Sequence, residues 1–307
     1  MGVLRLGYAH IRVTDMAAAR RHYTQVIGFR PVLDNSDKLY LKGWDEWDHH
    51  SLVLEQGGVG ISKLGFKVSR AEDIDKIENR AVRFGVTTSR MSKGENPEVS
   101  DGLRIILPST HIVEIYHEQT IVGREVGTIN PELCPPGVAG MGAPRIDHAL
   151  LGCDSVSETE QFFLRVLGMY QTERLVADLD HQDTVLATWL SVANRGHDIA
   201  LIGGPGYNGK LHHLAFMLEN GWPDILHAAQ VISRAGVPID MGPTQHGVTR
   251  GKTIYFWDPS GNRDEVFSDG YVAQRDQPAF IWTADQVGRG INAITRTLNE
   301  TFTTVLT

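Results

Sequence analysis

The spacing of apolar residues predicts a short helix that begins near residue 156 and ends before Gly168. Four apolar residues share one face of that helix: Phe162, Phe163, Val166 and Leu167. A glycine directly after the last apolar pair is typical of a helix that ends in a left-handed residue. The preceding residues, 145–149, contain His148 and predict a strand. This part of the chain therefore predicts a strand, then a short helix, then a glycine stop.

The same order of elements occurs near the start of the chain. Residues 7–29 also predict a strand with a histidine, a short helix, and an apolar pair followed by glycine, as residues 145–169 do. The two halves end alike, because residues 108–116 and 259–267 each predict a turn and then a strand that carries a glutamate. Chance similarity of two strand–helix segments is the alternative, but two echoes in the same order favour duplication.

Each half divides again into two units in which one strand, one helix and three strands follow one another. The units are predicted at about residues 4–55, 64–117, 146–202 and 211–267. Helices are expected over residues 71–84 in the second unit and 222–235 in the fourth. Residues 128–143 are rich in proline and glycine, which is the composition of a linker.

This order predicts an α+β fold of four βαβββ units in two domains. The non-catalytic amino-terminal domain is expected at residues 1–127 and the linker at 128–143. The catalytic domain is expected at 144–270, followed by a tail at 271–307 that packs near the site.

The charge balance and the cysteines narrow the class of protein. The formal net charge is -8 and no long basic run occurs, which argues against nucleic-acid and membrane-surface partners. Cys134 and Cys153 are too few for a disulfide framework in 307 residues. No segment approaches the roughly 20 apolar residues of a membrane span. We therefore expect a cytoplasmic protein.

Two histidines and one glutamate lie at matching points of the predicted units. His148 is on the first strand of the third unit, His213 on the first strand of the fourth, and Glu265 on the last strand of the fourth. If the first strands pair around a shared cup, the three side chains converge. Two imidazoles and one carboxylate form the facial triad of non-haem Fe(II) oxygenases. Zinc is a competing interpretation, although no H-E-x-x-H helix supports it.

Residues 244–265 carry the most specific motif in the chain. Its ordered positions are His246, Tyr255, Asp258, Pro259, Gly261 and Glu265. This order resembles the signature of extradiol ring-cleavage dioxygenases, and residues 145–148, 196–198, 211–213 and 298–307 look like catechol 2,3-dioxygenase. The resemblance implies the vicinal-oxygen-chelate fold of glyoxalases and bleomycin-resistance proteins. It also implies a homotetramer that takes part in the catabolism of aromatic hydrocarbons.

The resemblance implies a role for each candidate residue. His148, His213 and Glu265 would be the iron ligands, and His197 would be the acid/base near bound oxygen. His246 and Tyr255 would hydrogen-bond the substrate oxygens. Histidine suits proton transfer because its unperturbed pKa is about 6.5, and a phenol can donate to a catecholate oxygen. The alternatives are a turn position for His246 and a packing role for Tyr255.

Apolar walls are what an aromatic ring requires, and three residues are candidates for them. Val248 lies two residues after His246, whereas Ile291 and Phe302 belong to the tail. Plain core positions are the alternative for the two tail residues. His212 and Asp147 adjoin ligand histidines, and strand alternation places both on the opposite face, so neither is expected to be a ligand.

The function implied is extradiol (meta) cleavage of catechol or an alkylcatechol by O2 at Fe(II), which gives a 2-hydroxymuconic semialdehyde-type product. Mn(II) would use the same ligands, and no organic cofactor is called for. Two rival functions remain, a glyoxalase or thiol transferase and a non-catalytic ligand-sequestering protein. The first needs no His246–Tyr255 pair, and the second needs no convergent triad.

One metal per chain is expected, because the first half lacks a full ligand set. The sequence echo places His10 at the position of His148 and Glu114 at that of Glu265. Where the second half has His213, the first has Lys63 or Leu64. A lysine cation repels Fe(II) and a leucine offers no donor atom.

Overall fold

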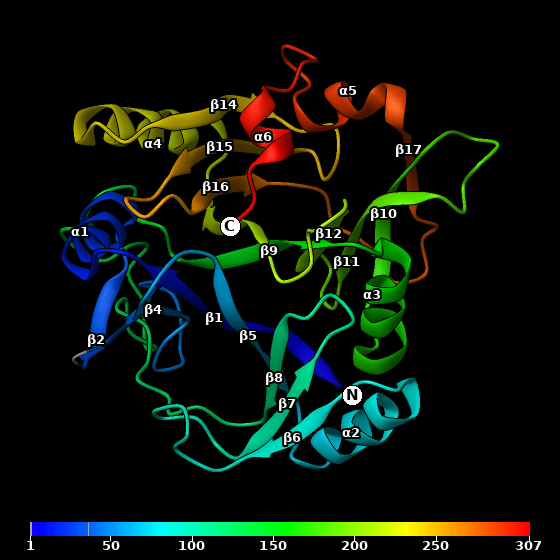
Figure 1. Cartoon of the computed structure of the whole chain (residues 1–307). Helices are drawn as coiled ribbons and strands as arrows, with labels where there is room; N and C mark the ends of the chain where they lie inside the picture. Colours follow the sequence, from blue (N-terminus) through cyan, green and yellow to red (C-terminus); the bar gives the residue numbers. More distant parts are fainter. Residues whose placement is uncertain (1, 36) are drawn as a thin grey trace.

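Each predicted unit forms one strand, one helix and three further strands in the computed structural model, which describes residues 2–35 and 37–307 (Figure 1). The first half contains β1 (Val3–Val13), α1 (Met16–Arg21), the π-helix η1 (His22–Ile27), β2 (Arg30–Asp34), β3 (Lys38–Lys42), β4 (Leu52–Gln56), β5 (Ile61–Val68), α2 (Glu72–Phe84), β6 (Thr88–Met91), β7 (Gly102–Ile106) and β8 (Ile112–Tyr116). The two units of the second half and the tail that follows them are equally regular. They contain β9 (Arg145–Cys153), α3 (Val156–Phe162), the π-helix η2 (Phe163–Leu167), β10 (Tyr170–Val176), β11 (Val185–Ser191), β12 (Ile199–Gly203), β13 (Leu211–Leu218), α4 (Trp222–Ala235), β14 (Ile239–Gln245), β15 (Gly251–Trp257), β16 (Arg263–Asp269), β17 (Phe280–Thr283), the 3₁₀ helix η3 (Ala284–Gln286), α5 (Val287–Ile291) and α6 (Glu300–Thr304).

Two mixed sheets divide the strands between the halves of the chain. The first sheet has the order β2-β3-β4-β1-β5-β8-β7-β6, and the second has β14-β15-β16-β13-β9-β12-β11-β10-β17. In each sheet the first strands of two units pair antiparallel at the centre, β1 with β5 and β9 with β13. The last strand of a unit runs parallel beside them, so β16, β13 and β9 are neighbours. The expected α+β fold of four βαβββ units is confirmed.

Local signals explain where the first helix of each half begins and ends. The Asp15 carboxylate accepts from the Ala18 N–H before α1, and the Ser155 hydroxyl accepts from the Glu158 N–H before α3. Such caps satisfy a backbone donor that has no partner within the helix. Both helices then pass into a π-helical turn that ends at a left-handed glycine, Gly28 with φ 100° and Gly168 with φ 72°.

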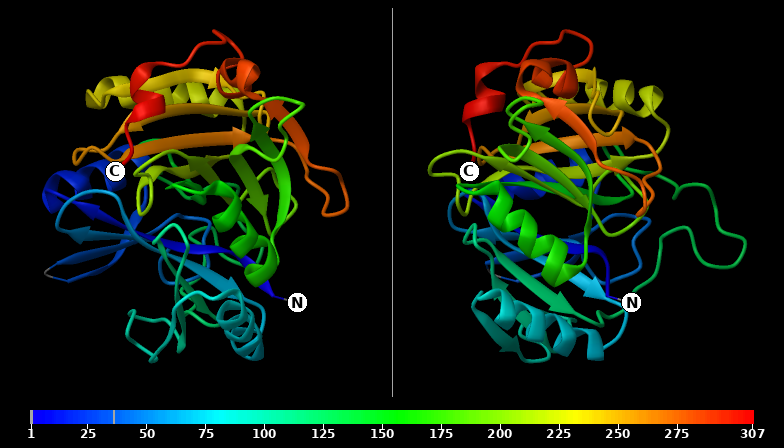
Figure 2. Two further views of the ribbon diagram at one scale, coloured as in Figure 1. Left: turned by 45° about the vertical axis from the view of Figure 1, so that its right-hand side comes forward. Right: turned by 90° about the vertical axis from the view of Figure 1, so that its right-hand side faces the viewer.

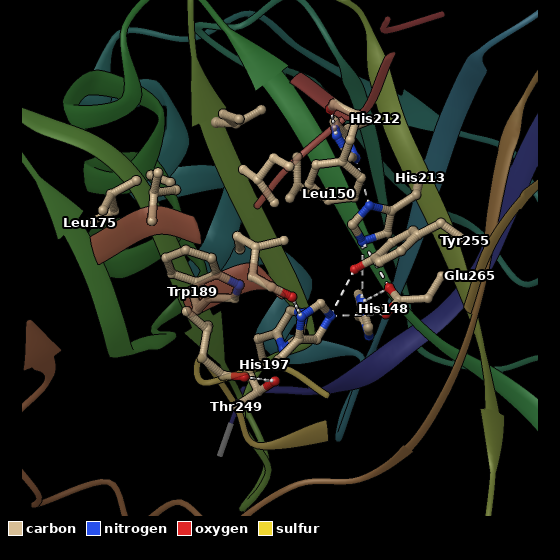
Figure 3. Close-up of a pocket in the computed structure, with 18 of the residues that line it drawn as sticks. His148, Leu150, Leu175, Trp189, His197, His212, His213, Thr249, Tyr255 and Glu265 are labelled. Carbon is tan, nitrogen blue, oxygen red and sulfur yellow. Dashed lines mark hydrogen bonds and ion pairs between the residues drawn. The ribbon is translucent and has the colours of Figure 1, made fainter. Parts of the chain in front are cut away.

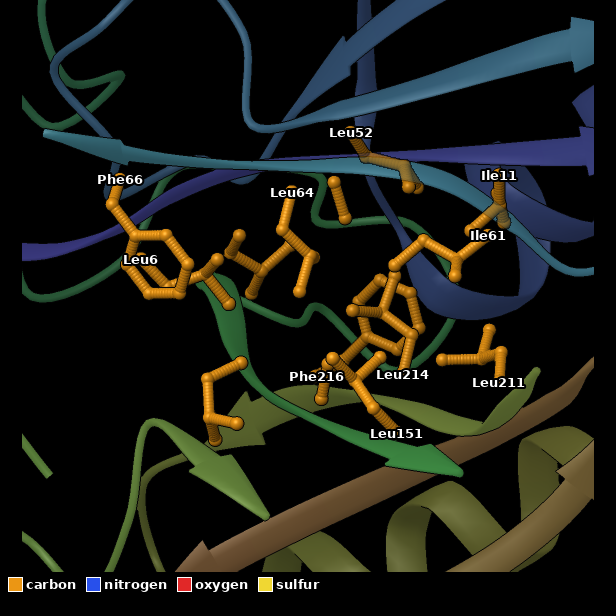
Figure 4. Packing of buried hydrophobic residues seen from close by; sticks show 14 of the residues in the cluster. Leu6, Ile11, Leu52, Ile61, Leu64, Phe66, Leu151, Leu211, Leu214 and Phe216 are labelled. Atoms are coloured by element: carbon orange, nitrogen blue, oxygen red, sulfur yellow. The ribbon is translucent and has the colours of Figure 1, made fainter. Parts of the chain in front are cut away.

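The two sheets pack face to face through a shared apolar core (Figure 4). Leu6, Leu64 and Phe66 of the first sheet lie opposite Leu151, Leu214 and Phe216 of the second. The Phe216 ring makes an edge-to-face contact with Phe29, with ring centroids 5.3 Å apart. Burying each such side chain contributes about 1.5–3 kcal/mol. This packing fixes one face of β9 and β13, which leaves the other face for the site.

The residues after β16 return over the second sheet. Strand β17 pairs in parallel with β10, and α5 and α6 lie above the upper sheet in Figures 1 and 2. Thr307 exchanges backbone hydrogen bonds with Leu211 at the start of β13, at 2.6 and 2.9 Å. Across residues 2–35 and 37–307, no helix combines the length and apolar character needed to cross a membrane.

Candidate metal centre

The three candidate ligands come from adjacent strands of the second sheet. His148 lies in β9, His213 in β13 and Glu265 in β16, and all three side chains are buried. Their ligand atoms all lie within 4.8 Å of one another. Figure 3 shows the two imidazoles and the carboxylate pointing toward one another. The convergence expected from the sequence is therefore present in the fold.

The distances between the ligand atoms fit a single metal ion. Nε2 of His148 lies 2.9 Å from Oε2 of Glu265, Nε2 of His213 lies 3.1 Å from that oxygen, and the two Nε2 atoms are 3.3 Å apart. Ligands about 2.1 Å from one ion in neighbouring octahedral positions are about 3.0 Å apart. Two nitrogens and one carboxylate suit Fe(II) or Mn(II) and leave positions open for other ligands.

The charges at the site are coupled. Burial alone would raise the pKa of Glu265, but His213 and His148 lower it well below its usual value. Burial lowers the pKa of His148, but Glu265 and Asp147 outweigh burial and raise it to about 9. A buried carboxylate of this kind requires a cationic partner, and a divalent metal would supply it.

Asp147 holds the ring of His148 from behind. Nδ1–H of His148 donates to Oδ2 of Asp147 at 2.7 Å, and Arg195 donates to Oδ1 of Asp147 and, at 2.9 Å, to its backbone oxygen. Burial would raise the pKa of Asp147, but Arg195 and His148 lower it to about 2. The expectation that Asp147 faces away is wrong, because β9 carries an extra residue between Ile146 and Ala149 relative to β13.

His212 was also expected on the opposite face, and the same physical reason overturns that expectation. Leu211 pairs with Leu151 and His213 pairs with Leu150, so β13 bulges at His212. A bulge redirects a side chain, and His212 lines the same cavity as His213. His212 is not among the three converging ligands, as expected.

The remaining candidates for chemistry surround the triad. The His197 ring lies 3.9 Å from the His148 ring, measured between centroids. Burial, and then the charge of His148, lower the pKa of His197 well below its usual value. Nδ1–H of His246 donates to the Ile291 oxygen at 2.5 Å, which leaves Nε2 to accept from the Tyr255 hydroxyl at 2.9 Å. Burial, followed by Glu265, raises the pKa of Tyr255 well above 10.

A cavity of about 100 Å³ opens beside these groups. A cavity of roughly 150 Å³ can bind one benzene molecule in a protein. Its apolar lining consists of Leu150, Leu175, Ala187, Trp189, Ile202, Val248, Phe267, Val287, Ile291, Leu298 and Phe302. The structure thus places the three residues proposed for the pocket, Val248, Ile291 and Phe302, in the cavity wall.

The strand register corrects the expected match between the halves. Ala9 pairs with Leu64 in the first sheet, and Ala149 pairs with Leu214 in the second. The equivalent of His148 is therefore Tyr8.

His10 is not that equivalent. Its Nδ1 contacts Oε1 of Glu55 at 2.9 Å. The same register matches Lys63 with His213, and Glu114 with Glu265, since these glutamates pair with Gly65 and Ala215.

Known families match both halves of the chain. Residues 145–266 match the Glyoxalase/Bleomycin resistance protein/Dioxygenase superfamily, and residues 62–120 match the catechol 2,3-dioxygenase-like N-terminal domain. The chain is 38% identical to a metapyrocatechase of Pseudomonas sp. (strain CF600), over 100% of this chain and 99% of that protein. It is 26% identical to a manganese-dependent 2,3-dihydroxybiphenyl 1,2-dioxygenase of Geobacillus genomosp. 3, over 94% of this chain and 93% of that protein.

A solved structure agrees with these sequence matches. The 2,3-dioxygenase LapB from Pseudomonas sp. KL28 superposes with a TM-score of 0.88 at 38% identity, covering 93% of this chain and 99% of that one. The resemblance expected from the sequence, and the vicinal-oxygen-chelate fold that it implied, are confirmed. The chain therefore belongs to the extradiol dioxygenase family, beside metapyrocatechase, which is catechol 2,3-dioxygenase.

Proposed function

We propose that this enzyme opens the ring of catechol, or of an alkyl-substituted catechol, with O2 at a mononuclear Fe(II). The product would be of the 2-hydroxymuconic semialdehyde type, formed in the breakdown of aromatic hydrocarbons. One observation carries the proposal: three buried ligand atoms converge at the wall of an apolar cavity of about 100 Å³. Mn(II) would take the same ligands, and one relative is named a manganese-dependent dioxygenase.

The metal's contribution is to offer open positions for substrate and O2 and a path for electrons from the ring to oxygen. The protein's contribution begins with the proton that catechol must lose on binding. Tyr255 and His246 form one hydrogen-bonded pair beside Glu265, with His246 Nε2 3.5 Å from Oε1 of that carboxylate. Nε2 of His246 can accept a proton because Nδ1 already donates to a backbone oxygen. The Tyr255 hydroxyl then donates to the substrate oxygen.

His197 is proposed as the acid/base on the oxygen side of the ring. It lines the cavity beside His148, and its lowered pKa keeps it neutral in the metal-free site. Its side chain lines the cavity, so its ring lies within reach of ligands bound there. A neutral imidazole can take up a proton and return it in a later step.

The cavity wall favours a ring with uncharged substituents. Of the described residues that line it, Glu265 carries the one formal charge at neutral pH apart from the histidines, and we assign it to the metal. A substituent carboxylate would lie against leucine, valine and isoleucine side chains with no cation to pair with. Burying an unpaired charge in this way is strongly unfavourable. Alkyl groups, in contrast, gain about 0.8 kcal/mol for each buried methylene.

We also propose that the enzyme works as a cytoplasmic homo-oligomer, a tetramer by its family resemblance. Ile129 and Leu133 are 86% and 96% exposed, on a segment that extends away from the sheets in the right-hand view of Figure 2. Exposed large apolar side chains on an extended segment are typical of a subunit contact. The two cysteines are free, which fits a reducing compartment.

Anaerobic loading of the full chain with Fe(II), followed by catechol and air, tests the proposed reaction. A yellow ring-opened product is expected with catechol and with 4-alkylcatechols, but only weakly with a carboxylated catechol. Parallel loading with Mn(II) identifies the preferred metal. Iron-loaded protein that binds catechol and forms no such product would contradict the proposal and favour the glyoxalase-type or ligand-sequestering alternatives.

A further inference from the structure

His212 lies beside the proposed metal ligands without belonging to them. Its side chain is 1% exposed, and its ring stands nearly perpendicular to that of His213, with centroids 5.0 Å apart. Nδ1 of His212 lies 2.7 Å from Nδ1 of His213, and Nε2 of His212 lies 2.8 Å from the backbone oxygen of Phe302. Both ring nitrogens of this buried histidine are therefore engaged.

The positions of the hydrogen atoms follow from the chemistry of these partners. A carbonyl oxygen only accepts, so Nε2 of His212 carries the hydrogen that it donates to Phe302. In a neutral ring, Nδ1 of His212 is then an acceptor, and Nδ1 of His213 is its donor. That arrangement leaves the lone pair of His213 on Nε2, which is the atom that faces Glu265 and His148.

The Phe302 carbonyl is itself held firmly. Arg263, which is fully buried, donates to the oxygens of Thr301 at 2.8 Å and Val305 at 3.0 Å, on either side of Phe302. It also donates to the His212 backbone oxygen at 3.0 Å. The tail and the bulge in β13 therefore share one buried cation.

We propose that His212 is a positioning residue that fixes the tautomer and the direction of His213 and couples helix α6 to the metal centre. The proposal rests on the metal site proposed above, and it extends that site to the tail. His148 has a carboxylate as its hydrogen-bond partner, whereas His213 has a neutral histidine. Removing the hydrogen-bond partner of a metal-bound histidine typically weakens metal binding about 10–100-fold.

Metal affinity, rather than turnover, is the measurement that tests this role. Mn(II) is titrated into the full-length metal-free chain, and free Mn(II) is followed by electron paramagnetic resonance. His212→Phe keeps the ring and removes both hydrogen bonds, so its Kd is expected to rise about 10–100-fold. His212→Asn retains an acceptor near the Nδ1 position and loses the donation to Phe302, so it is expected to recover part of that affinity.

His111→Phe is the matched control. His111 is also a buried histidine with one ring nitrogen on a backbone oxygen, that of Lys210 at 2.9 Å, and the other on a side chain, the Ser109 hydroxyl at 2.9 Å. It has no contact with a proposed ligand. Its variant is expected to lose stability and to keep the wild-type Kd for Mn(II). A wild-type Kd in His212→Phe, or an equal loss in His111→Phe, overturns the proposal.

A measurement on the unaltered chain decides the question if His212→Phe does not fold. Nitrogen-15 resonances of the histidine rings in the Zn(II)-loaded protein distinguish the two neutral tautomers. His212 is expected with its hydrogen on Nε2, and the opposite tautomer or a doubly protonated ring overturns the proposal. Failure of wild-type protein to bind one Mn(II) per chain would instead overturn the proposed metal site itself.

Discussion

The two central strand pairs of the molecule, β1–β5 and β9–β13, share a register and differ in the side chains that they place beside a buried glutamate. We call the surroundings of Glu114 the first cup and those of Glu265 the second cup. In the second pair, His148 and His213 face Glu265. In the first pair, the equivalent positions are Tyr8 and Lys63, which face Glu114. The fold thus places a glutamate carboxylate at the equivalent position of each sheet. The neighbouring side chains determine whether that carboxylate forms ion pairs or is available to a metal.

Glu114 has its charge compensated by protein groups. Tyr8 donates to it at 2.7 Å, Lys63 lies 3.1 Å away, and Arg104 donates at 2.9 and 2.6 Å. Arg104 pairs with Glu114 in the sheet as Tyr255 pairs with Glu265. Two cations therefore occupy the surroundings that the second half leaves open, and they would repel a divalent ion.

The bulge beside the site is also duplicated. In β5 the pairs His10–Lys63 and Ile11–Ile61 leave Ser62 as the extra residue, as His212 is in β13. The Ser62 hydroxyl donates to Glu55 at 2.7 Å. The same backbone irregularity thus supports an ion-pair network in one half and a metal-ligand partner in the other.

The largest expected effect separates the two glutamates. Glu265→Gln should lose metal and activity together, by more than the roughly 10–100-fold loss that follows removal of an outer partner. Glu114→Gln should keep one metal per chain and full turnover, but lower the free energy of unfolding by about 3 kcal/mol, because Lys63 and Arg104 lose the buried carboxylate that compensates them. Metal analysis and urea denaturation check both variants. Loss of metal from Glu114→Gln would show that the first cup is a working site.

Two substitutions at the second cup should slow the reaction without removing the metal. His197→Phe and His246→Asn are expected to lower kcat about 10²–10⁴-fold, which is the usual contribution of a positioned acid or base. Metal content should stay at the wild-type value in both. If either variant loses its metal, that residue is a ligand and the proposed division of roles is wrong.

The four units, the helix at Trp222–Ala235 and the converging triad could all be predicted, because apolar spacing and matched positions are visible in the sequence. The sequence echo matches His10 with His148, but the strand register matches Tyr8 with His148. Gly28 and Gly168 lie 140 positions apart, as do Tyr8 and His148, whereas aligning two histidines shifts the match by two residues. Matching the two histidines by residue type gave the wrong pair, whereas the constant offset of 140 residues gives the pair that the sheets show.

The partners of the ligand histidines were not predictable for a different reason. Alternation along a strand places Asp147 and His212 away from the site, and a bulge in each strand reverses that placement. A bulge depends on pairing with a distant strand, which local sequence does not reveal. The position of Asp147 directly before His148 was the one sequence signal for a hydrogen-bond partner of that ligand. No sequence signal pointed to Arg195 as the partner of Asp147.

Three substitutions should convert the first cup into a metal site. Tyr8→His, Lys63→His and Arg104→Tyr together copy the second half around Glu114. A second Mn(II) per chain is expected, bound more weakly than the first because His212 has no counterpart beyond Ser62. Tyr8→His alone should still bind one Mn(II), since Lys63 remains. Equilibrium titration gives both stoichiometries, and a second Mn(II) on the wild-type chain would contradict the comparison.

A smaller effect concerns pH. Burial, with Lys63 in addition, lowers the pKa of His10 to about 4, although Glu55 partly opposes this. The unfolded chain, with a histidine pKa of about 6.5, therefore binds a proton that the folded chain refuses between these values. Stability should fall as pH drops through 6.5 toward 4, by up to about 2 kcal/mol at pH 5. His10→Leu, which copies Leu150 of the second half, should flatten this dependence in urea denaturation, and an unchanged slope would count against it.

The smallest effect tests whether the size of the cavity in the second cup determines which ring substituents the enzyme accepts. Val248 is 3% exposed in the cavity wall, and Val99 is 2% exposed in the first cup, packed with Tyr8 and Tyr116. Val248→Ala enlarges the cavity by about two methyl groups, so kcat/KM for a bulkier 4-alkylcatechol should rise relative to catechol by about fivefold, which is about 1 kcal/mol. Val99→Ala removes the same atoms from beside Tyr8 and Tyr116 in the first half, where no metal ligand is proposed, so it should lose comparable stability and keep the substrate ranking. A ranking that stays unchanged in Val248→Ala, or shifts equally in Val99→Ala, would mean that the wall at Val248 does not contact the ring substituent.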